Sequence, residues 1–297
     1  MTLSRAFDIE IFASGARAIA VALVFAVSCA GAAKAEDGYE LWLRYTPVEG
    51  ALLAEYRNAA AAIIAPGASD TIAAARDELQ RGLAGMTGRS PSLDTRVRRD
   101  GAILVGTPAD SPEIAALNLP LDEAGAEGFL LRSTRVSGKR TLVIAANSDA
   151  GVLYGAFELL RLMQQRKTLA NLDVVSAPKV ELRLLNHWDN ITGSIERGYA
   201  GETLWDWHKL PKRIDPRYTD YARANASLGI NGTVINNVNA NASILTPMYL
   251  ERVAALASVN RRFQSGRSAS AGGEDGSSVR AGDRAAVGCR PQTQLPP

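Results

Sequence analysis

Between residues 179 and 257 the chain twice repeats a strand-like run, a loop and a helical pattern. Residues 180–185 and 231–238 form the strand-like runs, and residues 216–228 and 247–257 follow them as helical segments. Strands and helices that alternate in this order are typical of βα units, in which each helix connects two parallel strands. This stretch therefore predicts an α/β fold built on a parallel sheet.

Polar and aromatic side chains follow both predicted strands at the point where each strand ends. Residues 187–190, His-Trp-Asp-Asn, come after the first strand, and residues 236–239, Asn-Asn-Val-Asn, close the second. In α/β barrels the rim at the carboxyl ends of the strands carries the functional site. Asparagines at strand ends also serve as turn formers, but the pattern occurs at both strands, which favours a site.

The loop of residues 185–211 concentrates the large aromatic residues of the chain. It contains three of the four tryptophans, both histidines and one tyrosine, namely Trp188, Trp205, Trp207, His187, His208 and Tyr199. Many glycine, asparagine and aspartate residues prevent a regular helix or strand over much of it. A loop of this kind is usually a binding surface carried by a scaffold. The alternative is a capping loop whose tryptophans only cover the core.

The preceding residues, 36–178, predict an α+β domain of their own. The expected elements are strands at residues 39–45, 102–106 and 172–175, helices at 52–62, 69–83 (capped by Ser69) and from 149, and a hairpin of 128–133 with 140–145. Net charge is only +2 and no basic stripe with interleaved aromatics is present, which argues against a nucleic-acid partner.

The first 35 residues have the pattern of a secretory signal peptide. Arg17 precedes an apolar run over residues 18–33, and Ala-Lys-Ala at 33–35 forms a small-x-small cleavage site. The run is short for a membrane span. We therefore expect cleavage near Ala35, a periplasmic or secreted protein, and no stable membrane insertion afterwards. A lipoprotein modified at Cys29 is the alternative, although Ala26 stands where a leucine-like residue is needed.

From Ser258 onward bulky apolar residues almost vanish, and serine, glycine, arginine and proline take over. Residues 258–297 are therefore expected to be a disordered tail. Two βα units do not close a barrel, which needs eight, so a frameshift or premature stop near Ser258 is the interpretation. Cleavage of the signal would leave Cys289 as a single cysteine. With two histidines and no H-E-x-x-H spacing, neither a metal site nor a cofactor is expected.

Three blocks of the sequence are distinctive: EDGYELWLRY at residues 36–45, LLNHWDNITGSIERGYAGETLWDW at 184–207 and YARANASLGINGTVINNVNA at 221–240. Together they resemble the α-glucuronidases of glycoside hydrolase family 67. The resemblance covers about residues 36–257. It implies a small N-terminal α+β domain over residues 36–178, followed at 179–257 by the first two βα units of a (β/α)8 TIM barrel. It also implies that intact relatives are homodimers.

The resemblance implies an inverting glycosidase that releases (4-O-methyl)glucuronic acid from xylan-derived oligosaccharides. Inversion needs two separated carboxyl groups, and in this family both lie on later barrel strands. No catalytic residue is therefore assigned, and Asp189, Glu196 and Glu202 are not taken as substitutes. The polypeptide is expected to be inactive. The alternatives are a non-catalytic carbohydrate-binding remnant and a stable α+β domain with an unfolded remainder.

Part of the sugar pocket can be carried over from the resemblance. Trp188 and Val238 are expected to form an apolar sheath around the O4 substituent of the uronic acid, because indole and methyl ether groups suit each other. Asp189 and Asn190 lie on the same rim and are expected to contact substrate. Arg197 could bind the uronate carboxylate as a bidentate fork, or it could fix the loop through an ion pair with Glu196 or Glu202. The expected partner is a uronic-acid-bearing xylo-oligosaccharide.

Overall fold

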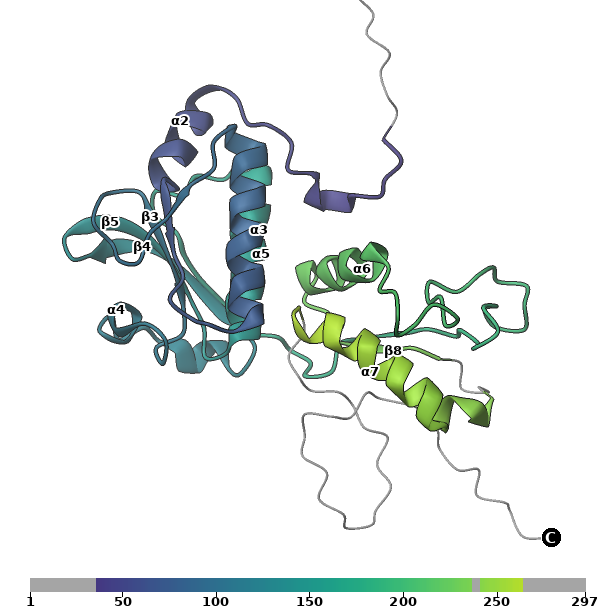
Figure 1. The fold of residues 1–297 in the computed structure, drawn as a ribbon. Helices are drawn as coiled ribbons and strands as arrows, with labels where there is room; N and C mark the ends of the chain where they lie inside the picture. The colour runs from purple at the N-terminus through teal and green to yellow at the C-terminus, as the bar shows by residue number, and fades with distance from the viewer. Residues whose placement is uncertain (1–35, 237–240, 264–297) are drawn as a thin grey trace, which may run out of the picture. The chain divides into compact units, whose positions relative to one another are not determined.

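The computed structural model describes residues 36–236 and 241–263 (Figure 1). The chain divides after Leu41 into two compact units, and the second, from Trp42 onward, contains both sheets. Among the described residues, no helix has the length and apolar character needed to cross a bilayer. The predicted signal peptide, Val238, and residues 264–297 of the predicted tail lie outside the described residues.

A six-stranded sheet forms the centre of the region from Trp42 to Ser176, with strand order β2-β1-β3-β5-β4-β6. The strands are β1 (Ala62–Ile64), β2 (Ser92–Leu93), β3 (Ala102–Gly106), β4 (Phe129–Val136), β5 (Lys139–Ala145) and β6 (Asp173–Ser176). β1 pairs parallel with β2 and β3, β3 pairs parallel with β5, and only β4 runs antiparallel to its neighbours. The region is thus a mixed α/β sheet with mostly parallel pairing, rather than the expected α+β arrangement.

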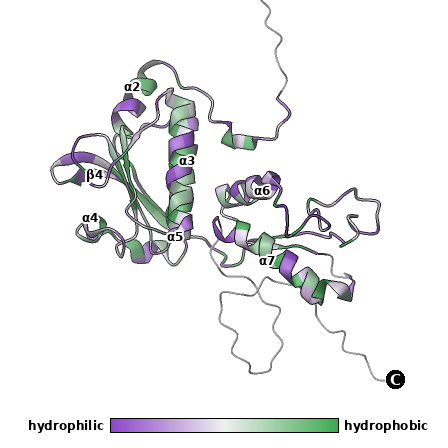
Figure 2. Cartoon of the chain, in the orientation of Figure 1, coloured by the Kyte–Doolittle hydropathy of each residue, from purple (hydrophilic) through white to green (hydrophobic). Residues whose placement is uncertain are grey.

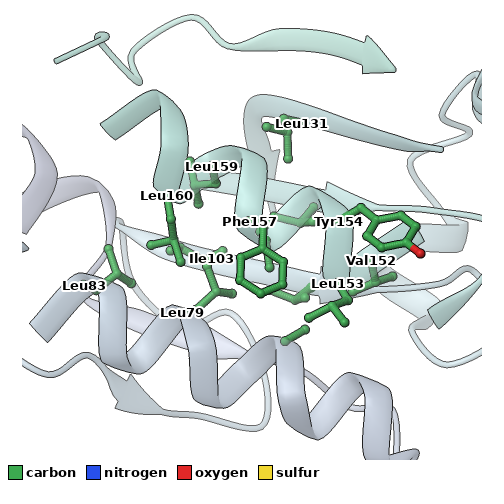
Figure 3. Close-up of a cluster of buried hydrophobic side chains, with 14 of the residues drawn as sticks. Leu79, Leu83, Ile103, Leu131, Val152, Leu153, Tyr154, Phe157, Leu159 and Leu160 are labelled. Atoms are coloured by element: carbon green, nitrogen blue, oxygen red, sulfur yellow. The ribbon is translucent and has the colours of Figure 1, made fainter. Parts of the chain in front are cut away.

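Two long helices, α3 (Asp70–Thr87) and α5 (Asp149–Gln164), pack on one face of this sheet (Figure 1). Leu79 and Leu83 of α3 lie in the same buried cluster as Phe157 and Leu160 of α5 (Figure 3). Gly82 permits the close approach of the two helices, because a Cβ there would lie 2.6 Å from Leu160 Cδ2. Hydrophobic residues fill the central strands, whereas α3 alternates hydrophobic and hydrophilic stripes (Figure 2).

The remaining helical elements of this region are short: η1 (Leu41–Arg44), α2 (Gly50–Ala59), α4 (Pro112–Ala115) and η2 (Leu121–Ala124). The hairpin prediction and the Ser69 cap are confirmed, since β4 and β5 pair antiparallel and Ser69 Oγ accepts a hydrogen bond from Ile72 N. The predicted helix end near Leu83 is wrong. α3 continues to Thr87 because Gly88, with φ of 67°, is the residue that adopts the left-handed conformation.

Two other predictions for this region are wrong for local reasons. Residues 39–45 do not form a strand, since Leu41 and Tyr45 have φ angles of 51° and 47° and the residues between them form η1. The alternation of apolar residues there serves a 3-10 turn that buries Leu43 and Tyr45. The helix predicted to run to Ala62 ends at Ala59, and the β-branched pair Ile63–Ile64 becomes part of strand β1.

The second region contains the two predicted strand–helix repeats. β7 (Leu184–Asn186) pairs in parallel with β8 (Gly232–Val234), with Leu185 opposite Thr233. α6 (Pro216–Ser227) follows β7, and η3 (Ala242–Leu245) and α7 (Pro247–Arg261) follow β8. The parallel pair confirms the prediction, although both strands are shorter than expected. The proposed tail boundary at Ser258 is too early, because α7 continues to Arg261 and Phe263 is buried.

Candidate functional site

The candidate site lies at the carboxyl ends of β7 and β8. His187 N donates a hydrogen bond to Val234 O at 2.8 Å, which extends the pairing one residue beyond the strands. Because the strands are parallel, the residues that follow them emerge at the same edge of the sheet. Residues 187–190 and residues 235–236 therefore form one rim, as the sequence predicted.

The aromatic residues of the loop divide into two groups by burial. Trp205 and Trp207 are each 1% exposed and belong to a cluster with Tyr218, Ile244 and Tyr249. Trp188 is 46% exposed and Tyr199 is 77% exposed. Two tryptophans therefore cover the core, as the capping interpretation expects, whereas Trp188 and Tyr199 are exposed. That this exposed part of the loop binds a ligand stays a prediction.

His187 is a packed and hydrogen-bonded ring rather than a free ligand. Its Nε2 lies 2.6 Å from Tyr221 Oη, and its ring centroid is 5.5 Å from that of Trp205. Nδ1 is 3.7 Å from Asp189 Oδ1. Burial raises the pKa of Tyr221, so its hydroxyl stays protonated. Tyr221 of α6 thereby fixes the residue that directly precedes Trp188.

Asp189 and Asn190 lie where their polar groups hold the loop. Asp189 is 2% exposed and accepts a short hydrogen bond from the Thr203 hydroxyl. Asn190 Nδ2 donates to Glu196 O at 2.7 Å and to Ser194 O at 3.2 Å. These contacts give both residues a structural role in the loop. Their predicted contacts with substrate stay predictions. The sequence did not predict the hydrogen bond from Thr203 to Asp189, because a single threonine in a loop belongs to no recognisable motif.

Arg197 is exposed at the tip of the loop. No ion pair joins it to Glu196 or Glu202 in the described part of the chain, so its guanidinium is not committed to the loop-fixing alternative. Glu196 adopts a left-handed φ of 55° and donates its backbone N–H to Trp188 O at 2.8 Å. Partial desolvation and the neighbouring Glu196 carboxylate raise the pKa of Tyr199. Glu196 therefore links the two exposed aromatics of the loop.

Metal-binding groups are absent from the described residues. Over residues 36–236 and 241–263, no cluster of three or more His, Cys, Asp or Glu side chains could hold a metal ion. A cavity of about 470 Å³ lies in the sheet region, between the α2 residues Glu55 and Asn58 and the β4–β5 hairpin. What the rim offers is an exposed indole, an exposed phenol and an exposed guanidinium on one loop.

Comparisons of the sequence with known proteins identify the family. Residues 41–159 match the sequence model of the glycosyl hydrolase family 67 N-terminus, and residues 162–269 match that of the family 67 middle domain. The rim residues fall within the middle-domain match. The chain is also similar to a probable alpha-glucuronidase A of Aspergillus oryzae, with 35% identity over 246 residues. Alpha-glucuronidase A of Emericella nidulans is 34% identical over 243 residues.

These alignments cover 81% and 78% of this chain and 28% of each relative, so the chain spans about 28% of their length. A solved structure described as a family GH115 4-O-methyl-alpha-glucuronidase with specificity for decorated arabinogalactans has 18% identity and a TM-score of 0.49. It covers 69% of this chain and 28% of its own, a likeness too weak to support a conclusion. The two domain matches, together with the relatives, show that the chain belongs to glycosyl hydrolase family 67.

Proposed function

We propose that residues 42–176 are the N-terminal domain, and residues 184–263 the first two βα units of a (β/α)8 catalytic barrel, of an inverting α-glucuronidase. Its reaction is the release of (4-O-methyl)glucuronic acid from xylan-derived oligosaccharides. The observation that carries the proposal is the exposed Trp188 at the carboxyl end of a parallel β7–β8 pair, within the family 67 middle-domain match. The names of the relatives, alpha-glucuronidase A, support the substrate class.

Two of the exposed groups on the rim, the indole of Trp188 and the guanidinium of Arg197, have partners on a methylglucuronic acid. The indole face of Trp188 can pack against the sugar ring and its O4 methyl group. The part that the resemblance implies for Val238 falls outside the described residues. Arg197 can hold the uronate carboxylate with two parallel N–H donors, because its guanidinium has no carboxylate partner in the loop. Asp189 and Asn190 keep the loop in shape and lie beside this pocket.

The rim residues do not supply the acid and the base. Inversion requires two carboxyl groups about 6.5–9.5 Å apart, with room for a water on the opposite sugar face. Asp189 is buried and bonded to Thr203, so it is not free to reach a glycosidic oxygen. We therefore propose that the polypeptide of residues 36–297 binds the uronic acid but does not hydrolyse its bond. A non-catalytic carbohydrate-binding protein is the second candidate, favoured by the exposure of Trp188.

The expected export and assembly belong to the same proposal. Cleavage near Ala35 would deliver the protein to the periplasm or medium, and no stable membrane insertion would follow. A homodimer is proposed by analogy with intact relatives, and nucleic acid is not an expected partner. The mass of the N-terminus from a cell fraction tests the cleavage site. A lipid-modified Cys29 would replace this proposal with the lipoprotein alternative.

The deciding experiment measures binding and turnover separately. Residues 36–297 are titrated calorimetrically with a xylotriose that carries methylglucuronic acid and, as a control, with plain xylotriose. We expect tighter binding of the acidic sugar, a loss of that preference in Trp188→Ala and Arg197→Gln, and no uronic acid release. Equal affinity of the parent protein for both sugars would contradict the proposed uronate pocket. Measurable release of uronic acid removes the claim of inactivity.

A further inference from the structure

The most exposed large aromatic side chain of the described residues is Tyr199, and the uronate pocket proposed above does not use it. Single exposed apolar side chains are common and need no explanation. Tyr199 differs because its surroundings tie it to Trp188. A flat, amphipathic phenol with two side-chain torsions also gives a large contact area at a low entropy cost. These properties make it a candidate for contact with a second sugar.

The backbone of the loop presents Tyr199 at the tip of a small lobe. Thr203 N donates to Gly193 O at 2.9 Å, and Ile195 N donates to Gly201 O at 3.0 Å. Bridges between Asp189 and Ile195 and between Ser194 and Glu202 reinforce the base. The two segments of the lobe are thus paired below the tip, and residues 196–200 project beyond the paired part. The backbone hydrogen bonds below the tip therefore fix its position on the loop.

Glycines set the conformation of the tip. Gly198 and Gly201, on either side of Tyr199, have φ angles of 94° and 101° and no neighbouring atom within 4 Å of where a Cβ would lie. Gly198 N donates to Ile195 O at 2.9 Å, which closes the turn. No described side chain packs over these glycines, so the space beside Tyr199 is open to a ligand.

Glu196 connects Tyr199 to the uronate pocket. Its backbone N–H is bonded to the carbonyl of Trp188, and its side chain neighbours the phenol of Tyr199. Arg197 lies between Glu196 and Tyr199 along the tip. Trp188, Arg197 and Tyr199 therefore belong to one loop and are connected through Glu196.

We infer that Tyr199 is a stacking platform for a neutral pyranose next to the uronic acid, namely a xylose of the oligosaccharide backbone. A sugar face is apolar at its C–H groups, and an aromatic ring offers the matching surface. Stacking tolerates different neutral sugars because it reads no hydrogen-bond pattern. This inference rests on the proposed function for its position relative to the uronic acid, but not for the existence of the neutral site.

The test titrates residues 36–297 with three probes: neutral xylotetraose, a uronate-bearing xylotriose and free glucuronic acid. Tyr199→Ala should weaken both oligosaccharides about tenfold, the equivalent of about 1.4 kcal/mol, and leave free glucuronic acid unchanged. Tyr199→Phe keeps the ring and should retain affinity within about twofold. Tyr39→Ala, which removes another exposed phenol, is the matched control. Thermal melts of all variants should coincide with that of the parent protein.

The outcomes separate the two proposals. Unchanged oligosaccharide affinity in Tyr199→Ala overturns the platform, and so does an equal loss for free glucuronic acid, which would place Tyr199 in the uronate pocket itself. Failure of the parent to bind xylotetraose also overturns it. If Tyr199→Ala weakens xylotetraose binding but the parent shows no preference for the acidic sugar, the platform stands and the uronate pocket falls.

Discussion

The sheet region and the βα region differ in how completely their parallel strands are covered. All five residues of β3 are buried, whereas β7 has one half-buried residue and two exposed ones, among them Leu185. Parallel strands are normally buried on both faces. The sheet region meets this condition with neighbours from its own chain segment. Within the described residues, β7 and β8 pair only with each other. The apolar residue types of these strands therefore do not by themselves determine how far the strands are buried.

Polar links join the βα region to the sheet region, beside the apolar packing of Ala222 and Ala226 of α6 into the core of the sheet region. Arg223 of α6 donates to both oxygens of Glu78 of α3, from Nε and Nη2, each at 2.7 Å. Tyr45 Oη donates to the same carboxylate at 2.5 Å. Burial, followed by the Glu78 charge, raises the pKa of Tyr45, so its hydroxyl stays protonated. Ser227 adds bonds from Trp42 Nε1 and Arg161 Nη2. These links are directional, so single substitutions should break them.

The largest effect is expected for Arg223→Ala. It leaves the carboxylate of Glu78, which is 3% exposed, buried beside a truncated partner, and breaking a buried pair typically costs about 3–5 kcal/mol. The loss should fall on the βα region first. Limited proteolysis of the parent should protect the chain through Arg261, and the variant should release a resistant fragment that ends near Pro178. Urea denaturation measures the change in unfolding free energy.

The control for this variant is Arg81→Ala. Arg81 also pairs with Glu78, at 3.5 Å, but its side chain is 57% exposed, so we expect a loss of about 0–1 kcal/mol. Replacing both Glu78 and Arg223 by Met removes the buried charges together and should cost much less than Arg223→Ala alone. If the proteolytic pattern of Arg223→Ala matched that of the parent, the polar links would not be what holds the βα region.

The second prediction compares two tryptophans within the βα region. Trp205→Ala removes a ring that packs against His187, Tyr218 and Tyr221, and should destabilise this region by about 3–5 kcal/mol. Trp188→Ala removes a half-exposed ring and should change stability by less than about 0.5 kcal/mol while abolishing the preference for acidic sugar. Tryptophan fluorescence during urea unfolding measures the stability of both variants. A similar loss of stability in both variants would contradict the division between the core tryptophan Trp205 and the exposed Trp188.

Helix caps provide a smaller test of whether the two regions unfold together. Ser148 caps α5 by accepting a bond from Gly151 N at 3.3 Å, and Asp215 caps α6 by accepting one from Arg217 N at 3.0 Å. Each substitution to Ala should cost about 1 kcal/mol. If the regions are separate units, Ser148→Ala should accelerate amide exchange only in the sheet region and Asp215→Ala only in the βα region. Acceleration in both regions by either variant would show one cooperative unit.

Sequence reasoning succeeded where local signals agreed with the final packing. The Ser69 cap, the hairpin of residues 128–133 with 140–145 and the two strand–helix repeats were predicted from local patterns, and the structure contains each of them. It failed at residues 39–45 and at Ile63–Ile64, where tertiary neighbours decide the conformation. Alternating apolar residues fit a strand equally well, and only the left-handed backbone at Leu41 and Tyr45 distinguishes the turn.

At the rim, the sequence predicted that the residues after the two strands share one edge of the sheet, but not which of their side chains pack and which stay exposed. Tryptophan is equally suited to a core and to a sugar surface, so only the packing partners separate Trp205 from Trp188. The hydrogen bonds of Asp189 with Thr203 and of His187 with Tyr221 join residues 14 and 34 positions apart. No periodicity or motif specifies such pairs, because the first depends on how the loop folds back on itself and the second on how the loop packs against α6.

The smallest predicted effect is a difference in acid sensitivity between the two regions. Hydrogen bonds from the Arg140 backbone and then its side chain lower the pKa of Asp100 below its usual 3.8, and Lys209 does the same for Asp206. A depressed native pKa stabilises the fold above the usual value, and this contribution is lost as pH falls below about 4. Burial raises the pKa of Glu158, so the contribution of Glu158 to stability changes with pH in the opposite direction.

Asp100→Asn should therefore reduce the acid dependence of stability in the sheet region, and Asp206→Asn should reduce it in the βα region. Melting temperature and amide exchange between about pH 5 and 2.5 measure these changes. Both carboxylates are exposed, so the effects should shrink at high salt. If Asp206→Asn instead altered the acid response of the sheet region, the polar links through Glu78 and Arg223 would be transmitting stability between regions rather than only attaching one to the other.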